Sequence, residues 1–147
     1  MPNAIELLVG LKIPDTTAIT ALRALHKMGL KGIKSAVREN YYKFYIEGDE
    51  SKFRNDISKA DIIVNANKNY FRFGIEKSDK ISVLVRDMGE GSGLLKLLQE
   101  RLGFKNIKKM ENGILWTLEI EGSRKEIAKK AAEGLLHNWN YQEYSII

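Results

Sequence analysis

The residues that most often carry out chemistry in proteins are sparse in this sequence. Among 147 residues there are two histidines, His26 and His137, and no cysteine. Neither histidine has carboxylates or another histidine at metal-site spacing, so we interpret both as surface or edge residues. The absence of cysteine excludes disulfides, zinc–thiolate sites and cysteine nucleophiles. It also fits a reducing compartment, and we expect a cytoplasmic protein.

A glycine-rich stretch, Gly89-Glu90-Gly91-Ser92-Gly93, precedes a predicted helix and could present backbone N–H groups to an anion. The stretch lacks the spacing and the lysine of a P-loop, and it does not match G-x-G-x-x-G. Glu90 would also repel an anion. We therefore interpret it as a flexible strand-to-helix turn and predict no cofactor.

Paired carboxylates occur at Asp49-Glu50 and at Glu119 and Glu121, but the second pair flanks the end of a predicted strand and is expected to be exposed. The stretch Tyr70-Phe71-Arg72-Phe73 alternates aromatic and basic residues, a pattern that can stack nucleic-acid bases. A core strand with one exposed arginine is the favoured interpretation. No Ser/His/Asp set can be assembled, so we predict no catalytic and no metal-binding residues.

The charge pattern also argues against nucleic acid as a partner. Lys and Arg total 24 and Asp and Glu total 19, a formal net charge of +5, with acids interleaved throughout. The nearest basic cluster, Arg124, Lys125, Lys129 and Lys130, surrounds Glu126 and is typical of a solvated helix face. No apolar run approaches the roughly 20 residues of a membrane span, so we predict no membrane association.

The sequence contains an internal repeat. Residues 29–34 (Gly-Leu-Lys-Gly-Ile-Lys) recur at 103–108 (Gly-Phe-Lys-Asn-Ile-Lys), and Ile46-Glu47-Gly48 recurs as Ile120-Glu121-Gly122 at the same offset. Solenoid units have periods of about 20–50 residues. The repeat here is longer, roughly 70 to 75 residues, which is long enough for a small module with its own core. We predict two tandem copies, 1–75 and 81–147, joined by a linker at 76–80.

Hydrophobic periodicity predicts the elements of the first copy. Residues 5–11 alternate as a strand, and a helix capped by Asp15 follows and ends at Gly29. Two strands, 33–38 and 42–46, are predicted to form a hairpin with a tight turn near Glu39-Asn40. A second helix begins at Asp49, and a last strand carries Phe71, Phe73 and Ile75.

The second copy repeats this order. Its first helix ends at Gly103, and its hairpin is predicted at Asn112-Gly113, because Asn-Gly is the strongest short-range hairpin signal. Ser123 and Glu126 match a capping box that opens the second helix. Each copy is therefore predicted to be a β-α-β-β-α-β module of the α+β, ferredoxin-like class.

The alternation of aromatic residues predicts how the copies pack. Tyr42 and Phe44 lie on one face of the expected sheet, while Tyr41, Lys43 and Tyr45 lie on the other. Aromatic residues on the second face indicate that it is covered, and duplicated modules commonly keep a two-fold contact. We predict a pseudo-two-fold dimer of modules, with the sheets inward and the helices outward.

The first copy contains the stretches Ala24-Leu25-His26-Lys27-Met28, Ile33, Val37-Arg38 and 41–47. These stretches resemble the PurS family. A family-like helix end followed by a short strand occurs twice. The stretch Ile62-Ile63-Val64-Asn65 leads to Tyr70-Phe71-Arg72-Phe73, and Leu135-Leu136-His137-Asn138 leads to Glu143-Tyr144-Ser145-Ile146.

PurS is the small subunit of phosphoribosylformylglycinamidine synthase, an enzyme of purine biosynthesis. The resemblance implies a dimer-forming protein without catalytic residues that holds together a glutaminase (PurQ-like) and an ATP-dependent synthetase (PurL-like). One tandem chain would then correspond to one PurS dimer and serve as an accessory component of the ligase complex. Candidate contact residues are Arg38, Asn65 and Asn138, and further self-association is left open.

An alternative is an ACT-like module that binds a small metabolite. Tandem βαββαβ units also form ligand-binding pairs, which hold amino acids near the first strand-to-helix turn. Asp87, Gly89 and Gly91 fit such a turn in the second copy, although the first copy lacks the glycines. A third hypothesis, an enzyme with a carboxylate pair between the copies, has no positive support in the sequence.

Overall fold

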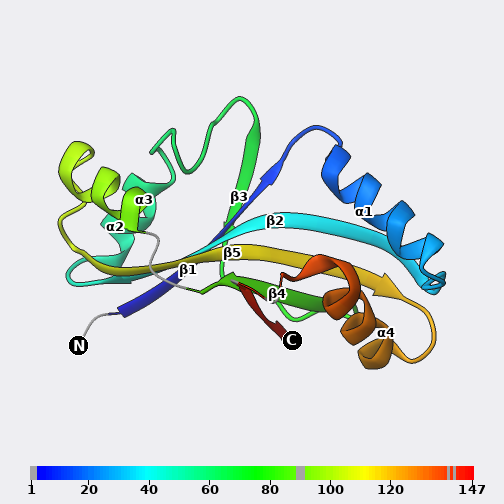
Figure 1. Ribbon diagram of the computed structural model, residues 1–147. Helices are drawn as coiled ribbons and strands as arrows, with labels where there is room; N and C mark the ends of the chain where they lie inside the picture. The colour runs from blue at the N-terminus through cyan, green and yellow to red at the C-terminus, as the bar shows by residue number, and fades with distance from the viewer. Residues whose placement is uncertain (1–2, 89–91, 139, 141) are drawn as a thin grey trace. The chain divides into compact units, whose positions relative to one another are not determined.

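The structure is a computed structural model that describes residues 3–88, 92–138, 140 and 142–147. The described residues form an α+β fold with one six-stranded antiparallel sheet in the order β3-β1-β2-β5-β4-β6 (Figure 1). We expected a separate sheet in each copy, and the strands of both copies instead belong to this one sheet.

The elements are β1 (Asn3–Leu11), α1 (Thr16–Lys27), β2 (Ile33–Ile46), α2 (Glu50–Ile57), β3 (Asn69–Phe73), β4 (Ile81–Asp87), α3 (Ser92–Lys96), β5 (Ile107–Ile120), α4 (Arg124–Ala131) and β6 (Gln142–Ile146). Two π-helical turns, η1 (Leu97–Arg101) and η2 (Ala132–Leu136), continue α3 and α4.

The two predicted hairpins are wrong, because β2 and β5 are each one continuous strand of 14 residues. Glu39-Asn40 and Asn112-Gly113 lie inside these strands, and Gly113 is not among the glycines with positive φ. A Cβ at Gly113 would instead overlap the carbonyl oxygen of Val85 in β4. The glycine therefore permits a close approach of two backbones rather than a turn. Each copy has the order β-α-β-α-β.

The described residues cluster into two compact units, and each unit contains segments from both predicted copies. Unit 1 comprises Met1–Ile13, Asn40–Ile75 and Gly89–Asn112, and unit 2 comprises Pro14–Glu39, Glu76–Met88 and Gly113–Ile147. Helix α3 of the second copy thus belongs to unit 1, and helix α1 of the first copy belongs to unit 2. Strands β2 and β5 pass from one unit to the other at the positions where we predicted turns.

The core of unit 1 depends on residues from both copies. Ile5, Leu7 and Phe44 of the sheet and Phe53 of α2 come from the first copy, whereas η1 and the start of β5 contribute buried apolar residues from the second: Leu98, Ile107 and Met110. The Phe53 ring packs edge-on against Phe44 at 5.3 Å between ring centroids. Because burial of apolar area drives folding, the first copy cannot close this core without η1 and β5.

The core of unit 2 mirrors this exchange. Helix α1 contributes Ala18 and Leu25 from the first copy, and these residues cluster with buried side chains of the second copy: Val83, Val85, Trp116, Leu118, Ala128, Ala131 and Ala132. The three alanines leave little side-chain bulk between α4–η2 and the sheet, so the helix and the strands can approach closely. Each of the two cores is thus closed by the other copy's first helix.

The helix ends were predicted better than the strand connections. Oδ1 of Asp15 accepts hydrogen bonds from the backbone N–H groups of Thr17 and Ala18, which confirms the cap of α1. Gly29 and Gly103 have positive φ, as a left-handed helix end requires. Ser123 precedes α4, but its side chain makes no capping hydrogen bond, so the predicted capping box is wrong. Its ψ of 80° falls short of the extended values that Asp15 and Asp49 adopt at 103° and 111°.

Candidate functional site

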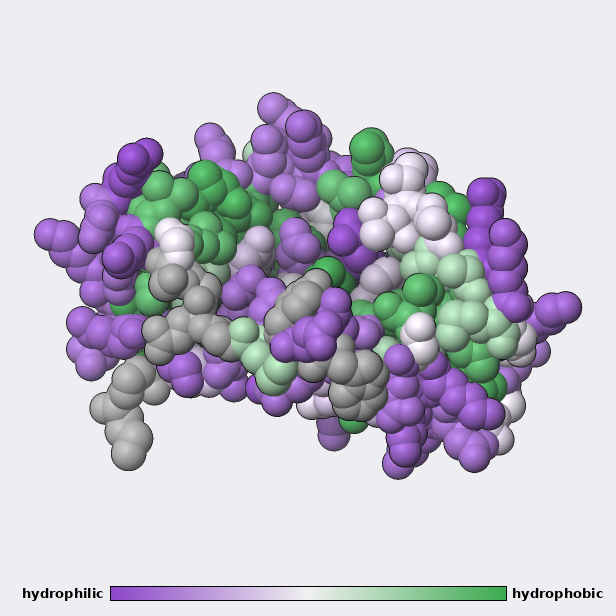
Figure 2. Space-filling view, viewed as in Figure 1, coloured by the Kyte–Doolittle hydropathy of each residue, from purple (hydrophilic) through white to green (hydrophobic). Residues whose placement is uncertain are grey.

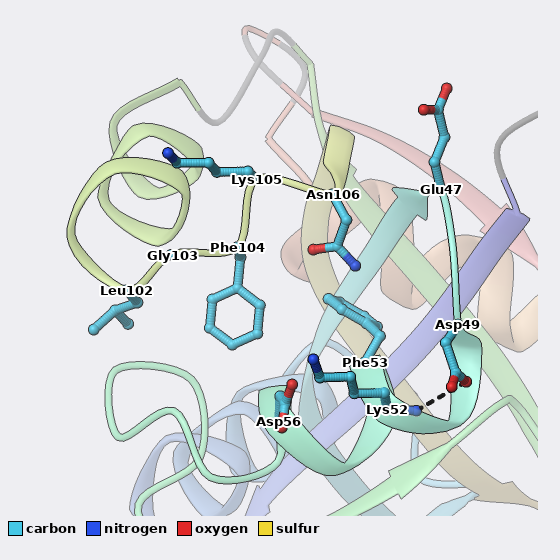
Figure 3. Close-up of a pocket in the computed structure, with 10 residues that line it drawn as sticks. All are labelled: Glu47, Asp49, Lys52, Phe53, Asp56, Leu102, Gly103, Phe104, Lys105 and Asn106. Carbon is cyan, nitrogen blue, oxygen red and sulfur yellow. Dashed lines mark hydrogen bonds between the residues drawn. The ribbon is translucent and has the colours of Figure 1, made fainter.

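A recess of about 540 Å³ lies in unit 1 between α2 and the loop that joins η1 to β5 (Figure 3). We call it the α2 groove. It is lined by Glu47, Asp49, Lys52, Phe53, Asp56, Leu102, Gly103, Phe104, Lys105 and Asn106. Figure 2 shows hydrophobic surface over the α2–α3 side of unit 1, bordered by hydrophilic side chains.

Local sequence places the α2 side of this groove. Asp49 caps the helix, and its Oδ1 accepts a hydrogen bond of 3.2 Å from the backbone N–H of Lys52. Residues three or four positions apart share one face of a helix, so Lys52, Phe53 and Asp56 project together from successive turns. The cap and the spacing therefore bring a cation, an aromatic ring and a carboxylate to one wall.

The opposite wall comes from the second copy. Gly103, at φ 78°, ends η1 and turns the chain so that Phe104 faces α2. The Phe104 and Phe53 rings pack edge to face, with centroids 6.0 Å apart. The main-chain oxygen of Asn106 accepts a hydrogen bond of 3.1 Å from the N–H of Glu47, which ties this loop to the end of β2.

The α2 groove combines an aromatic floor with a rim that carries both charges. Phe53 is buried and Phe104 is half-buried, while the three carboxylates and the two lysines are exposed. Figure 3 shows the Asn106 amide turned into the groove, where it can donate and accept hydrogen bonds. The lining contains neither a histidine nor a hydroxyl or thiol nucleophile. Such a surface can bind a mixed-charge ligand or a peptide segment.

A second recess, of about 430 Å³, lies in unit 2 and has no charged lining. Threonines 16, 17 and 20 of α1 form one wall, and the rest is Ala21, Ala24, Trp116, Leu135 and Leu136. Trp116 is 5% exposed, and its indole Nε1 has no hydrogen-bond partner within the described part of the chain. The two recesses thus differ sharply in polarity.

Arg38 already has a carboxylate partner inside the chain. Its Nε donates to Oδ2 of Asp15 over 3.0 Å, and its Nη2 lies 3.5 Å from Oδ1. Burial by itself raises the pKa of Asp15, but the hydrogen bonds from Arg38, Ala18 and Thr17 outweigh it and hold that pKa below its ordinary value. Arg38 therefore anchors β2 to the start of α1, and its contact with a partner stays a prediction.

Asn65 and Asn138 occupy the same local structure in the two copies. Oδ1 of Asn65 accepts from the N–H of Asn67 at 3.0 Å, and the N–H of Asn65 donates to the side-chain oxygen of Asn69 at 2.9 Å. The same two side-chain hydrogen bonds recur before β6, formed by Asn138, Asn140 and Gln142. Each asparagine thus shapes the turn that leads into the last strand, and its role as a contact residue stays a prediction.

Both histidines lie within hydrogen-bond distance of main-chain oxygens, and His137 is buried where we expected a surface or edge residue. Its side chain is buried at 7% exposure and packs edge-on against Tyr144 at 5.1 Å between centroids. Its Nε2 lies 2.7 Å from the main-chain oxygen of Gln142, and Nε2 of His26 lies 2.6 Å from that of Ile33. Each imidazole thus joins the end of a helix to the following strand.

The remaining candidates show no convergent chemistry. Gly89, Glu90 and Gly91 lie outside the described residues. Asp87 accepts a hydrogen bond of 2.9 Å from Nε2 of Gln142. Glu121 forms an exposed ion pair with Lys34, with 3.6 Å between Oε2 and Nζ. In the part of the chain that the structure describes, no three His, Cys, Asp or Glu side chains gather as metal ligands.

Strand β3 is an edge strand rather than the core strand that we favoured. Tyr70 is 37% exposed and Phe71 is 43% exposed, so two of its aromatic side chains reach solvent. The alternation of side chains along the sequence could not reveal this edge position, because edge strands and central strands have the same two-residue period. None of the described helices has the length and apolar character needed to cross a membrane.

The α2 groove itself was missed at the sequence level, because its two walls come from different copies. The only local signal is that Gly103-Phe104-Lys105-Asn106 belongs to the repeated motif. No protein-family model and no curated protein matches the chain.

Proposed function

We propose that the chain is a non-catalytic assembly subunit of the PurS type. It would bridge the glutaminase and synthetase subunits of a phosphoribosylformylglycinamidine synthase complex. The observation that carries the proposal is the paired turn at Asn65 and Asn138. The segments that resemble the end of a PurS chain fold in the same way twice, each leading into an edge strand.

The correspondence between the copies supports the idea that one chain takes the place of a dimer. Strands β2 and β5 have equal length, and α2 matches α4 in length. The glycines with positive φ at positions 29 and 48 recur at 103 and 122. We therefore propose a pseudo-two-fold pair of PurS-like modules in which the copies exchange their first helices.

Burial on the face of β1 and β2 opposite to Leu7 and Phe44 supports the proposal that this face of the sheet is covered. Leu8 and Tyr41 are partners in the β1–β2 register, and both are buried. The Tyr41 hydroxyl donates a hydrogen bond of 2.7 Å to Oε2 of Glu6, so its polar end is satisfied. Buried, satisfied groups of this kind belong to the architecture rather than to a reaction.

The α2 groove is the surface that we assign to a partner subunit. Its aromatic floor can take an apolar side chain, while the rim offers carboxylates and ammonium groups to charges on either side of that residue. Aromatic anchors surrounded by a polar rim are typical of protein interfaces. The neutral recess of unit 2 lacks these charges, which makes it the weaker candidate.

Reconstitution tests the proposal. The chain is mixed with a cognate glutaminase and synthetase, glutamine and ADP, and the mixture is analysed by size-exclusion chromatography and by glutamine-dependent synthetase activity. We expect a three-component complex and a gain in activity. The proposal is wrong if no complex elutes and glutamine-dependent activity is unchanged by the chain.

A pair of charge-reversal variants locates the docking surface. The Lys52→Glu/Lys105→Glu variant should weaken complex formation, because it removes both cations from the rim of the α2 groove. The Lys125→Glu/Lys129→Glu variant makes the same change in net charge on exposed positions of α4 and should bind as the wild type does. Equal loss in both variants would indicate a general charge effect and would remove the groove from the proposal.

A further inference from the structure

Strand β3 has an unpaired outer edge. It is the first strand in the sheet order, so β1 pairs with only one of its sides. The N–H of Gly74 donates to Glu6, and the N–H of Lys12 donates to Lys68, each over 2.9 Å. Antiparallel pairing alternates between inward and outward residues, so the main-chain groups of Phe71 and Phe73 point away from β1.

These outward groups have no acceptor or donor within the described chain. No hydrogen bond joins the N–H or C=O of Phe71 to another described residue. Asn69 differs, because its N–H donates to the main-chain oxygen of Asn65 over 2.7 Å. The edge therefore offers the N–H groups of Phe71 and Phe73 and the C=O groups of Asn69, Phe71 and Phe73.

The side chains at this edge are exposed and apolar. Phe71 is 43% exposed, and its ring packs edge-on against Phe73 at 5.8 Å between centroids. Leu11, which pairs with Asn69 in the β1–β3 register, is 36% exposed. On the opposite face Tyr70 is 37% exposed, and its ring lies over Gly10, where a Cβ would overlap it.

The edge carries few of the usual protections against pairing. Natural edge strands carry lysine, proline, bulges or inward charges, and 69–73 contains no proline, lysine or carboxylate. Its one charged residue, Arg72, donates from Nη1 to the main-chain oxygen of Gly74 over 3.3 Å. The matching strand β6, in contrast, carries Glu143 in an ion pair with Arg86 at 2.8 Å.

We propose that β3 pairs with β3 of a second copy of this chain, antiparallel and with the two-fold axis at Phe71. In this register Phe71 stands opposite the partner's Phe71, and Asn69 stands opposite the partner's Phe73. The two Phe71 residues exchange a pair of main-chain hydrogen bonds, and the N–H of each Phe73 donates to the other chain's Asn69 C=O. The N–H of Asn69 is already used, so the ladder ends there.

The sequence of the strand favours a second copy over a foreign strand. About the Phe71 axis, Arg72 stands opposite the partner's Tyr70, so no two like charges face each other and a cation can lie over an aromatic ring. The exposed rings of both Phe71 residues cover one another on the face that carries α2. A five-residue strand that is complementary to itself meets both conditions without any other sequence.

Sedimentation and light scattering on the purified full-length chain test the pairing. We expect a particle of twice the 16.8 kDa chain mass at high concentration, and dissociation on dilution. Phe71→Lys and Phe71→Glu should each be monomeric, because like charges would face each other across the axis. An equal mixture of the two variants should restore the dimer, since opposite charges then meet. Phe71→Tyr keeps the ring and should dimerise as the wild type does.

The mixing experiment separates this register from a general loss of stability. Circular dichroism establishes that each variant is folded, and a variant that does not fold is replaced by Phe71→Thr, which keeps strand propensity and should weaken the dimer at least tenfold. The proposal is overturned if the wild type stays monomeric at all concentrations, or if the mixture of charged variants stays monomeric. No partner subunit is present, so the result is independent of the proposed assembly function.

Discussion

The Nε atom of Arg38 in β2 lies 3.0 Å from Oδ2 of Asp15, and Oδ1 of the same carboxylate caps helix α1. The two side chains are 25% and 15% exposed, so the ion pair is partly shielded from water. One carboxylate therefore caps α1 and holds the start of this helix to β2.

Asp15→Asn should destabilise the protein by about 1–2 kcal/mol at pH 7, because it removes the charge from the pair with Arg38. Asparagine caps helices about as well as aspartate, so the cap itself is retained. Asp49→Asn is the matched control, since Asp49 caps α2 and no ion pair with an arginine is seen at its side chain in the described chain. Urea unfolding of both variants measures the difference, and an equal loss in the two would contradict an energetic role for the ion pair.

The same pair predicts how stability changes with pH. The pKa of Asp15 is lower in the folded chain than its ordinary value of about 3.9, so folding favours the ionised form. Its contribution is complete above that value and is lost as the pH falls below about 4. Between pH 6 and 3, the free energy of unfolding should fall less steeply in Asp15→Asn than in the wild type. Parallel curves would show that Asp15 does not titrate as described.

Gly113→Ala should destabilise unit 2 by about 1–3 kcal/mol, because the added methyl group would overlap the main chain of Val85 and neither strand can yield freely. Gly93→Ala is the control. A Cβ at Gly93 meets no atom within 4 Å, and alanine favours the helical conformation of α3. Chemical denaturation should therefore shift in opposite directions. A tolerated alanine at position 113 would mean that the strands are not packed so closely there.

Neither copy should fold alone, because each core needs the other copy's first helix. Fragments 1–75 and 81–147 should lack a cooperative unfolding transition when separate and regain it when mixed. The full chain cut within 76–80 should stay folded, since this exposed segment contributes to neither core. Circular dichroism and thermal unfolding provide the readout, and a cooperatively folding, monomeric 1–75 fragment would rule out the exchange.

Leu98→Ala should test the same exchange by a single change. Leu98 is fully buried in unit 1 although it comes from the second copy, so its loss should cost about 2–5 kcal/mol. Leu102→Ala, four residues further on and 46% exposed, should stay within about 0.5 kcal/mol of the wild type. Similar effects at both sites would place η1 outside the core.

Several features could be predicted from the sequence because they depend on neighbouring residues. The caps at Asp15 and Asp49 and the helix ends at Gly29 and Gly103 each need a side chain or a backbone angle within a few positions. The repeat could also be found, because comparing the sequence with itself requires no knowledge of the structure.

The connections between strands could not be predicted in this way. Asn112-Gly113 carries the local signal of a turn, yet the glycine is needed because β4 passes beside it. His137 likewise gave no local sign of burial, which results from its packing against Tyr144 in β6. In both cases the residue that determines the structure lies in another segment of the chain, β4 for Gly113 and β6 for His137.

The sequence by itself determined the α+β class, the caps at Asp15 and Asp49 and the presence of repeated motifs. Only the tertiary structure decided that β2 and β5 run unbroken, that Leu98 packs in the core of unit 1 and Leu25 in the core of unit 2, and that Phe53 and Phe104 meet in one groove. The physical reason is that capping and backbone angles act over a few residues. Burial of apolar surface, in contrast, is shared among segments of any separation.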